Sequence, residues 1–266
     1  MAQSPPGRRD QQTVSAYDAL ASVYDWLVPD ALLEPAGAVA AFGDVIAEVP
    51  SGARVLDCAC GTGQLAVGLA ARGFDVVASD ASAAMVDRTR RLATARHVDL
   101  RTAVCVWEDL REAVDGPFAA VFCVGNSLTH AEGSAGRRAA LAAMADVLAP
   151  GALLNVTSRN WERLRARRPG LEVAEQLTWR AGRAGLAIRA WSLPDAWDAP
   201  HHVEVAVAQL DGERVVDVIS THLRFWPFTH DELTADLRIA GLEPLSSGYA
   251  PDADRYAVVA QRMTGR

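Results

Sequence analysis

The segment RVLDCACGTGQLAVGLAARGFDVVASDAS, residues 54–82, constrains the fold more than any other part of the chain. An apolar run ends in Asp57, a turn with Gly61 and Gly63 follows, and an Ala/Leu-rich stretch then predicts a helix over residues 64–72. A second apolar run ends in Asp80. Two short apolar runs joined by a helix predict neighbouring parallel strands, because parallel strands need a long crossover between them.

The same alternation of strand and helix patterns continues to Arg159. The patterns predict strands within residues 100–110, 118–126 and 152–158, and helices over residues 13–28, 35–48, 82–95 and 134–149. Pro150 and Gly151 are expected to end the last of these helices. The fold class that this pattern predicts is α/β, with a Rossmann-like, doubly wound, mostly parallel seven-stranded sheet.

The pattern changes after Arg159. Longer, partly alternating runs predict strands over residues 185–193, 201–210 and 214–226, with a turn at Asp211 and Gly212. They indicate an antiparallel β insertion after the fifth strand, and a helix over residues 230–241 with strands over 243–247 and 256–262 then returns to the sheet. We therefore expect a leader and lid segment (1–34), a core (35–159 and 221–266) and an insertion covering the substrate site (160–220).

Composition excludes several classes of protein. The formal net charge of −7 disfavours nucleic acid as a partner, and no apolar run reaches the roughly 18 residues of a membrane helix. The first residues, MAQSPPGRRDQQ, are typical of a leader without a signal peptide, which indicates a cytoplasmic protein. The four cysteines lack metal spacing, so we expect reduced thiols and no metal: Cys58, Cys60, Cys105 and Cys123. A homo-oligomer is compatible with the sequence.

The acids and glycines of residues 54–82 indicate the ligand. A glycine turn between strand and helix brings backbone N–H groups close to a bound molecule, and an acid at the position of Asp80 suits ribose hydroxyls. Asp57 lies just before the turn, where it would repel a pyrophosphate and attract an ammonium group. S-adenosylmethionine has an adenosine, an ammonium and a sulfonium but no phosphate. It is therefore the expected cofactor, with a dinucleotide as the alternative.

These motifs resemble the class I S-adenosylmethionine-dependent methyltransferases, whose first motif is similar to VLDCACGTG and whose second is similar to VVASDASAAM. The resemblance implies that Asp57 and Gly61 face the methionine part and that Asp80 holds the ribose. It places Ala81 and Met85 against one face of the adenine, and Trp107 and Glu108 at its edge and other face. The remaining expected cofactor residues are Ala59, Gly63 and Val124.

Three further stretches resemble the glycine N-methyltransferase and sarcosine/dimethylglycine methyltransferase family: AYDALASVYDWL, FCVGNSLTHAEGS and APGALLNVTSRNWERL. In that family the arginine matching Arg159 anchors the carboxylate of the amino acid, and a guanidinium at the carboxyl end of a parallel strand suits this role. The catalytic candidates are His130, as a proton acceptor or pocket wall, and Tyr24, as part of a tyrosine lid. The expected substrate residues are Arg159, Asn126, Tyr17 and Trp197.

The chain departs from that family in three ways. It has no arginine between Arg9 and Arg54 for the cofactor carboxylate, and Val106 stands where the family tends to have asparagine. The insertion also contains Trp179, Trp191 and Trp197, which favour an acceptor larger than glycine.

The predicted function is methylation of a small molecule, most readily at the nitrogen of an amino-acid-like or specialised-metabolite amine. The alternatives are C- or O-methylation of an aromatic metabolite and a non-catalytic S-adenosylmethionine-binding protein. An RNA or protein methyltransferase is disfavoured by the acidic balance and by the absence of an NPPY-type tetrapeptide after the fourth strand.

Overall fold

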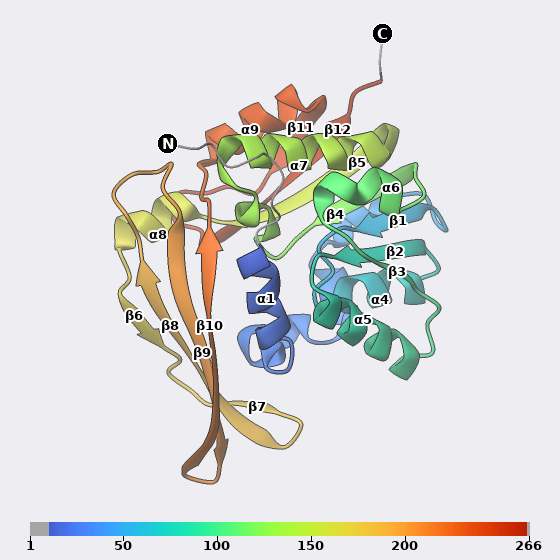
Figure 1. The fold of residues 1–266 in the computed structure, drawn as a ribbon. Coiled ribbons are helices and arrows are strands. Elements are labelled where there is room, and N and C mark those ends of the chain that lie inside the picture. The colour runs from blue at the N-terminus through green and yellow to red at the C-terminus, as the bar shows by residue number, and fades with distance from the viewer. Residues whose placement is uncertain (1–10, 265–266) are drawn as a thin grey trace.

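The computed structural model describes residues 11–264 and contains two β-sheets, which Figure 1 shows on either side of a short N-terminal helix. The larger sheet has seven strands in the order β11-β12-β5-β4-β1-β2-β3. Their bounds are β1 Arg54–Asp57, β2 Asp75–Asp80, β3 Arg101–Val104, β4 Phe118–Cys123, β5 Leu148–Arg159, β11 Leu242–Ser247 and β12 Arg255–Arg262. The first five run parallel, and β11 and β12 are antiparallel to their neighbours. The predicted fold class is confirmed.

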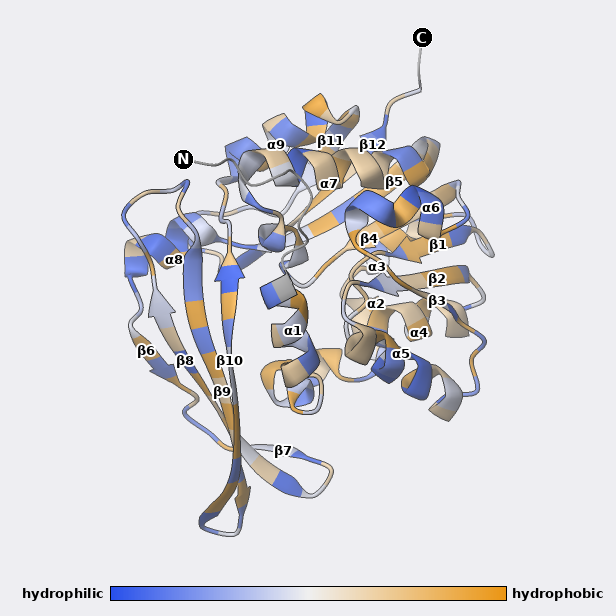
Figure 2. Cartoon of the chain, viewed as in Figure 1, coloured by the Kyte–Doolittle hydropathy of each residue, from blue (hydrophilic) through white to orange (hydrophobic). Residues whose placement is uncertain are grey.

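Helices cover both faces of this sheet because its strands alternate between two apolar cores. In β4, Val121 and Cys123 pack into one core, while Ala120 and Phe122 pack into the other. The first core is covered by α6 Leu110–Ala113, α7 Gly133–Val147 and α9 His230–Ile239. The second is covered by α2 Pro35–Ala40, α3 Gly43–Ala47 and α4 Gln64–Ala71, and α5 Ala83–Ala95 packs beside α4. Figure 2 shows hydrophobic colour along β4 and mixed colour on α5, as expected for a buried strand and an amphipathic helix.

The second sheet is antiparallel and has the order β10-β9-β8-β6, with β7 paired to β8. Its strands are β6 Leu171–Val173, β7 Thr178–Arg180, β8 Arg183–Ser192, β9 His201–Asp211 and β10 Arg214–Phe225, and α8 Trp161–Arg167 connects it to β5. Val203, Val205 and Val207 of β9 are buried on one face, which packs against the N-terminal segment. Figure 1 shows α1 Gln11–Leu20 between this sheet and the larger one.

The N-terminal segment lies between the two sheets and is tied to both of them (Figure 1). It consists of α1 Gln11–Leu20 and the 3-10 turns η1 Tyr24–Leu27 and η2 Asp30–Leu32. Arg88 of α5 forms an ion pair with Asp25 at 2.5 Å. Arg180 of β7 forms one with Asp30 at 2.6 Å. The role of this segment as a lid stays a prediction, and residues 1–10 of the expected leader lie outside the described residues.

Several expected boundaries are wrong. The helix predicted over 13–28 ends at Leu20, and a tight turn from Leu20 to Val23 lets both of these side chains pack against the buried face of the second sheet. The helix predicted over 35–48 is divided into α2 and α3, with a break at Ala41 and Phe42.

The helix predicted over 134–149 stops at Val147, and Pro150 and Gly151 lie inside β5 instead of ending the helix. Leu148 is fully buried and pairs with Phe118, and an irregularity in the register of β4 and β5 accommodates the Pro-Gly pair. The three-residue strands β6 and β7 were not predicted. Within residues 11–264, no helix has the length and apolar character needed to cross a membrane.

Candidate active site

The carboxyl ends of the parallel strands meet at one edge of the larger sheet, which faces the N-terminal segment. The chain leaves β1 toward β2 and β3 on one side, and β4 and β5 lie on the other side of β1. A crevice opens where the strand order reverses in this way, and ligands of open α/β sheets bind there. Asp57 and Asp80 end β1 and β2, while Arg159 ends β5.

In the glycine turn after β1, the space that a side chain would occupy is open at Gly61 and filled at Gly63. Gly61 has φ +53°, and a Cβ at this residue would meet no atom within 4 Å. Its N–H donates to Asp80 Oδ2 at 2.9 Å. Gly63 has φ +92°, but a Cβ there would lie 2.8 Å from the Thr89 hydroxyl on α5. The missing side chain of Gly63 thus allows α5 to approach the turn, and the expected contact of Gly63 with the cofactor stays a prediction.

Asp57 is 1% exposed and has an unpartnered oxygen. No described residue forms a hydrogen bond with its Oδ1. Burial raises the pKa of Asp57 from 3.8 to about 7; the N–H groups of Ala59 and Ala66 oppose this rise, while the charge of Asp80 adds to it. A buried carboxylate that lacks a partner is stabilised by a cationic ligand. The ammonium group of the expected cofactor fits this position.

The Asp80 carboxylate is positioned by two backbone N–H groups. Oδ2 accepts from Gly61, and Oδ1 accepts from Ser82 at 2.9 Å. Burial raises the pKa of Asp80 as well, and these hydrogen bonds oppose the rise. The residue is partly exposed, and each carboxylate oxygen has a second lone pair. Asp80 can therefore still accept from the hydroxyls of a ribose.

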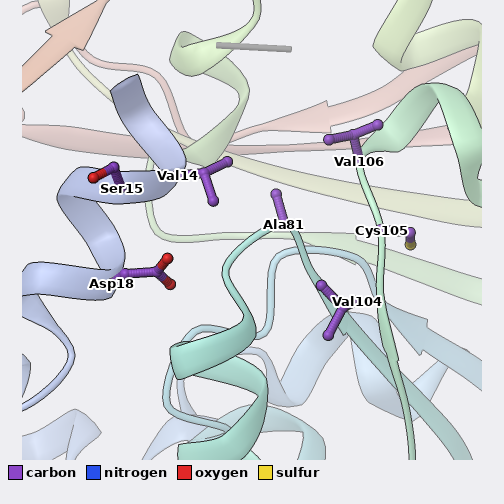
Figure 3. Close-up of a pocket in the computed structure, with 7 residues that line it drawn as sticks. All are labelled: Val14, Ser15, Asp18, Ala81, Val104, Cys105 and Val106. Atoms are coloured by element: carbon purple, nitrogen blue, oxygen red, sulfur yellow. The ribbon is translucent and has the colours of Figure 1, made fainter. Parts of the chain in front are cut away.

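A cavity of about 290 Å³ is lined in part by Ala81, the residue that follows Asp80 (Figure 3). Its walls come from the end of β2, the end of β3 and the N-terminal helix, and are formed by Val14, Ser15, Asp18, Ala81, Val104, Cys105 and Val106. Figure 3 shows Ala81 and Val14 on opposite sides of it. Apolar walls next to the acid that is expected to hold a ribose suit a flat base. Ala81 thus lies where an adenine contact is expected, and Val106 shares this wall.

The other expected cofactor residues have varied surroundings. Met85 is 1% exposed and lies in the packed interior, so it does not line the cavity. The Trp107 indole N–H donates to the Cys58 carbonyl at 2.9 Å, which fixes the ring against β1, and Glu108 is exposed. Ala59 and Val124 are half-buried at the ends of β1 and β4. Cofactor contacts of these residues stay predictions.

An aromatic wall faces this edge of the sheet. His130 Nδ1 lies 2.9 Å from the Arg224 carbonyl, which only accepts, so Nδ1 carries a proton. In the neutral ring, Nε2 therefore accepts from the Tyr17 hydroxyl at 2.8 Å. The Tyr24 ring lies 6.2 Å from the Tyr17 ring, although Tyr24 lies on η1, beyond the end of the helix that holds Tyr17. The pKa of each tyrosine is raised, mainly by burial.

Asn126 connects the loop after β4 to β5. Its Oδ1 accepts from the Arg159 backbone N–H at 2.9 Å and from the Trp161 indole at 3.2 Å, and its Nδ2 donates to the Thr129 hydroxyl at 2.9 Å. These bonds give Asn126 a structural role, and its expected contact with the acceptor stays a prediction. They also fix the backbone that carries Arg159.

The Arg159 guanidinium lies 5.3 Å from the centre of the Trp191 ring. Burial lowers the pKa of Arg159 to about 10, and the charges of Arg255 and Arg189 lower it further. The side chain forms no hydrogen bond or ion pair with any residue between 11 and 264, so it is available to an anionic ligand. Trp197, by contrast, lies under the guanidinium of Arg165 at 4.4 Å, and its contact with substrate stays a prediction.

The structure adds Asp18, Arg189 and Arg255 to the residues around the site. Asp18 lines the cavity, and its carboxylate accepts from the Ser82 hydroxyl at 2.5 Å. All three come from segments whose position depends on tertiary packing, and no local sequence signal marks them. The four cysteines are free, and no group of three or more potential metal ligands gathers in the described part of the chain.

Residues 55–151 match the family model described as "Methyltransferase domain". The chain is 44% identical over 114 residues to a glycine/sarcosine N-methyltransferase of Parasynechococcus marenigrum (strain WH8102), covering 42% of this chain and 40% of that protein. It is 32% identical over 128 residues to human glycine N-methyltransferase, covering 42% of each chain. The match thus spans about two fifths of the length of these curated relatives.

Solved structures match over nearly the whole chain but at low identity. The CcbJ methyltransferase from Streptomyces caelestis has a TM-score of 0.75 at 20% identity and covers 96% of this chain and 100% of its own. The sugar N-methyltransferase KedS8 from Streptoalloteichus sp ATCC 53650 has a TM-score of 0.70 at 21% identity and covers 99% of both chains.

This chain carries a methyltransferase domain, and the predicted resemblance to the S-adenosylmethionine-dependent enzymes, with that cofactor, is confirmed. The residues present fit the cofactor. The carboxyl edge of the larger sheet carries the unpartnered Asp57 oxygen, the open space at Gly61 and the apolar cavity lined by Ala81.

Proposed function

We propose that the protein transfers a methyl group from S-adenosylmethionine to the amine of a small molecule whose carboxylate or other anionic group is held by Arg159. The observation that carries the proposal is the Arg159 guanidinium, which is partly buried, stacked on Trp191 and without an acidic partner at the end of β5. The curated relatives named glycine/sarcosine and glycine N-methyltransferases support an amino-acid-like acceptor, and the fold neighbour titled a sugar N-methyltransferase supports a small-molecule amine.

The bound cofactor supplies an activated methyl group, so the protein has to position the acceptor and exclude water. Arg159 holds the anionic group of the acceptor through its N–H donors. The Arg159 side chain is positioned by two contacts. The Arg159 backbone N–H donates a hydrogen bond to Asn126, and the guanidinium lies over the Trp191 ring. The amine, which must be unprotonated to react, then lies between Arg159 and the cofactor.

Tyr17, Tyr24 and His130 form an aromatic cluster whose two phenols lie within electrostatic reach of Asp80. The raised pKa values of both tyrosines keep the phenols neutral near pH 7, so their oxygens are available as hydrogen-bond acceptors for polarised methyl or amine hydrogens. The His130–Tyr17 hydrogen bond fixes the orientation of one of these oxygens. No residue in this arrangement needs to form a covalent bond with the acceptor.

The test is a mass-resolved assay with methyl-labelled S-adenosylmethionine and a panel of amino acids, amino sugars and other amines. We expect a mass increase on an anionic amine, and we expect Arg159→Lys to raise KM strongly with a smaller change in kcat, because lysine loses the two-point contact. Equal kinetics of Arg159→Lys and the parent would remove the anchor role. Phenols and indoles belong in the panel, because the His130–Tyr17 pair is also the arrangement that an O-methylating enzyme would use as a base.

A further inference from the structure

Arg159 and Arg255 stand opposite each other on neighbouring strands. The antiparallel register of β5 and β12 pairs Arg159 directly with Arg255. Side chains at directly opposite positions project from the same face of a sheet with Cβ atoms about 5 Å apart. Two like charges at such a pair of positions are destabilising unless an anion lies between or beside them.

A third arginine reaches the same region from the second sheet. Arg189 lies two residues before Trp191 on β8, so both side chains project from the same face. Its register partner on β9 is Val205, which is 4% exposed on the inner face, and Trp191 pairs with Val203 of that face. Arg189 is thus a half-buried charge on an otherwise apolar surface. Because Arg159 stacks on Trp191 at 5.3 Å, the guanidinium groups of the two sheets converge.

The acids nearby do not neutralise these three charges. Asp254 already pairs with Arg163 at 3.1 Å and with Arg167 at 3.6 Å. Glu172 is the register partner of Arg189, and it accepts from the Trp191 indole at 2.7 Å.

None of the three arginines forms a hydrogen bond or an ion pair through its guanidinium with any residue in the described range. The mutual repulsion is visible in the lowered pKa of Arg159, to which both Arg255 and Arg189 contribute after burial. Glu172 and a bound monoanion would together neutralise two of the three arginines. At least one positive charge is therefore left without a counterion.

The cluster also borders the reaction site. The charge of Arg255 lowers the pKa of both Tyr17 and Tyr24, opposing the larger effect of burial, so Arg255 lies within electrostatic reach of these phenols. The same two tyrosines feel the charge of Asp80 at the end of β2. Arg255 and Asp80 thus both lie within electrostatic reach of the same tyrosine pair.

We propose that Arg159, Arg189 and Arg255 form one recognition site for a dianionic group, so that the methyl acceptor carries two negative charges, as in a dicarboxylate or a phosphate-bearing compound. This inference rests on the proposed function, since it identifies the cluster with the acceptor side of the methyl-transfer site. A single carboxylate together with Glu172 would still leave one of the three positive charges uncompensated.

The experiment is calorimetry at fixed ionic strength on the full chain, first with S-adenosylhomocysteine and then, on the loaded and the unloaded protein, with acetate, succinate and inorganic pyrophosphate. We expect succinate or pyrophosphate to bind at least tenfold more tightly than acetate. Tighter binding of pyrophosphate indicates a phosphate-bearing acceptor, and tighter binding of succinate indicates a dicarboxylate.

The variants Arg189→Gln and Arg255→Gln are each expected to weaken dianion binding about tenfold and to leave acetate binding within twofold. Arg214→Gln, at the exposed start of β10, is the matched control and is expected to change neither. Equal affinity for all three anions, or dianion binding unchanged in both variants, overturns the inference. Failure to bind S-adenosylhomocysteine overturns the proposed function instead, so the two failures are distinguishable.

Discussion

The Ser82 hydroxyl donates a hydrogen bond of 2.5 Å to the carboxylate of Asp18, and so joins the N-terminal helix to the first turn of α5. The same hydroxyl accepts from the Met85 N–H and caps α5. Asp18 also lines the cavity next to Asp80. One hydrogen bond thus links the lid segment to the strand end where the ribose of the cofactor is expected.

Asp18→Ala is expected to speed release of S-adenosylhomocysteine about fivefold, because the lid loses a hydrogen bond that contributes about 1 kcal/mol. The cap of α5 stays intact, so the melting temperature should change little. Stopped-flow measurement of the release rate tests this. Asp18→Asn keeps an accepting oxygen and serves as the control, and a release rate as slow in Asp18→Ala as in Asp18→Asn would contradict a lid role for this bond.

Substitutions at two glycines can separate an effect on cofactor binding from an effect on folding stability. Gly61 and Gly73 both have positive φ values, +53° and +89°, and a Cβ at either residue meets open space. Gly61→Ala and Gly73→Ala are therefore expected to destabilise the protein similarly, by roughly 1–2 kcal/mol of backbone strain. Only the methyl group at Gly61 would occupy the face that the cofactor needs.

We expect Gly61→Ala to weaken S-adenosylhomocysteine binding at least tenfold and Gly73→Ala to leave it unchanged, as measured by calorimetry beside urea unfolding of both variants. If the two variants bind equally well, the cofactor does not lie on Gly61.

The core of the fold was predictable from the sequence because its signals are local. The strand ending in Asp57, the cap at Ser82 and the helix closed by Gly73 each depend on neighbours within a few residues. The boundary at Pro150 and Gly151 was not predictable, since the pairing of Leu148 with Phe118, thirty residues away, decides where β5 begins.

The residues of the candidate site also divide into those with a local sequence signal and those that only tertiary packing brings together. Asp57, Gly61 and Asp80 lie in a contiguous motif, and the sequence identifies them. Arg189 and Arg255 lie in strands that only the packing of two sheets brings to Arg159. Gly63 illustrates the limit in another way, because the sequence shows that a small residue is needed but not whether a ligand or Thr89 occupies the space.

Asp57 gives cofactor binding a predictable pH dependence. Its pKa is about 7 in the cofactor-free protein because burial disfavours the charged form. A ligand ammonium favours the charged form, so binding below pH 7 must displace a proton from Asp57. The affinity for S-adenosylhomocysteine is therefore expected to rise with pH, by up to tenfold per unit between pH 5.5 and 7, and then to level off.

Asp57→Asn cannot ionise, so its weaker affinity should be flat over the same range. Calorimetry at pH 5.5, 6.2 and 7.0 compares the two proteins, and a slope that persists in Asp57→Asn assigns the titration to another group. The folding stability of the cofactor-free protein depends on pH in the opposite direction. The raised pKa of Asp57 favours the folded state fully below pH 4, and this contribution is lost as the pH rises toward 7.

A buried ion pair joins the helices α7 and α9. Arg137 of α7 and Asp236 of α9 lie 2.6 Å apart with side chains 5% and 6% exposed, and the Arg137 guanidinium also lies over the Phe228 ring. Asp236→Ala is expected to lower the free energy of unfolding by about 3–5 kcal/mol, because it leaves the Arg137 charge buried without a partner. Urea denaturation measures the change.

The double variant Arg137→Met with Asp236→Leu tests the cause, because replacing both charges by apolar groups removes the uncompensated charge. We expect it to recover most of the stability lost in Asp236→Ala. Asp195→Ala is the matched control, since its ion pair with Arg168 at 2.5 Å is largely exposed and should contribute under about 1 kcal/mol. A double variant as unstable as Asp236→Ala would mean that the pair matters for its packing and hydrogen bonds, and not for the charge left behind.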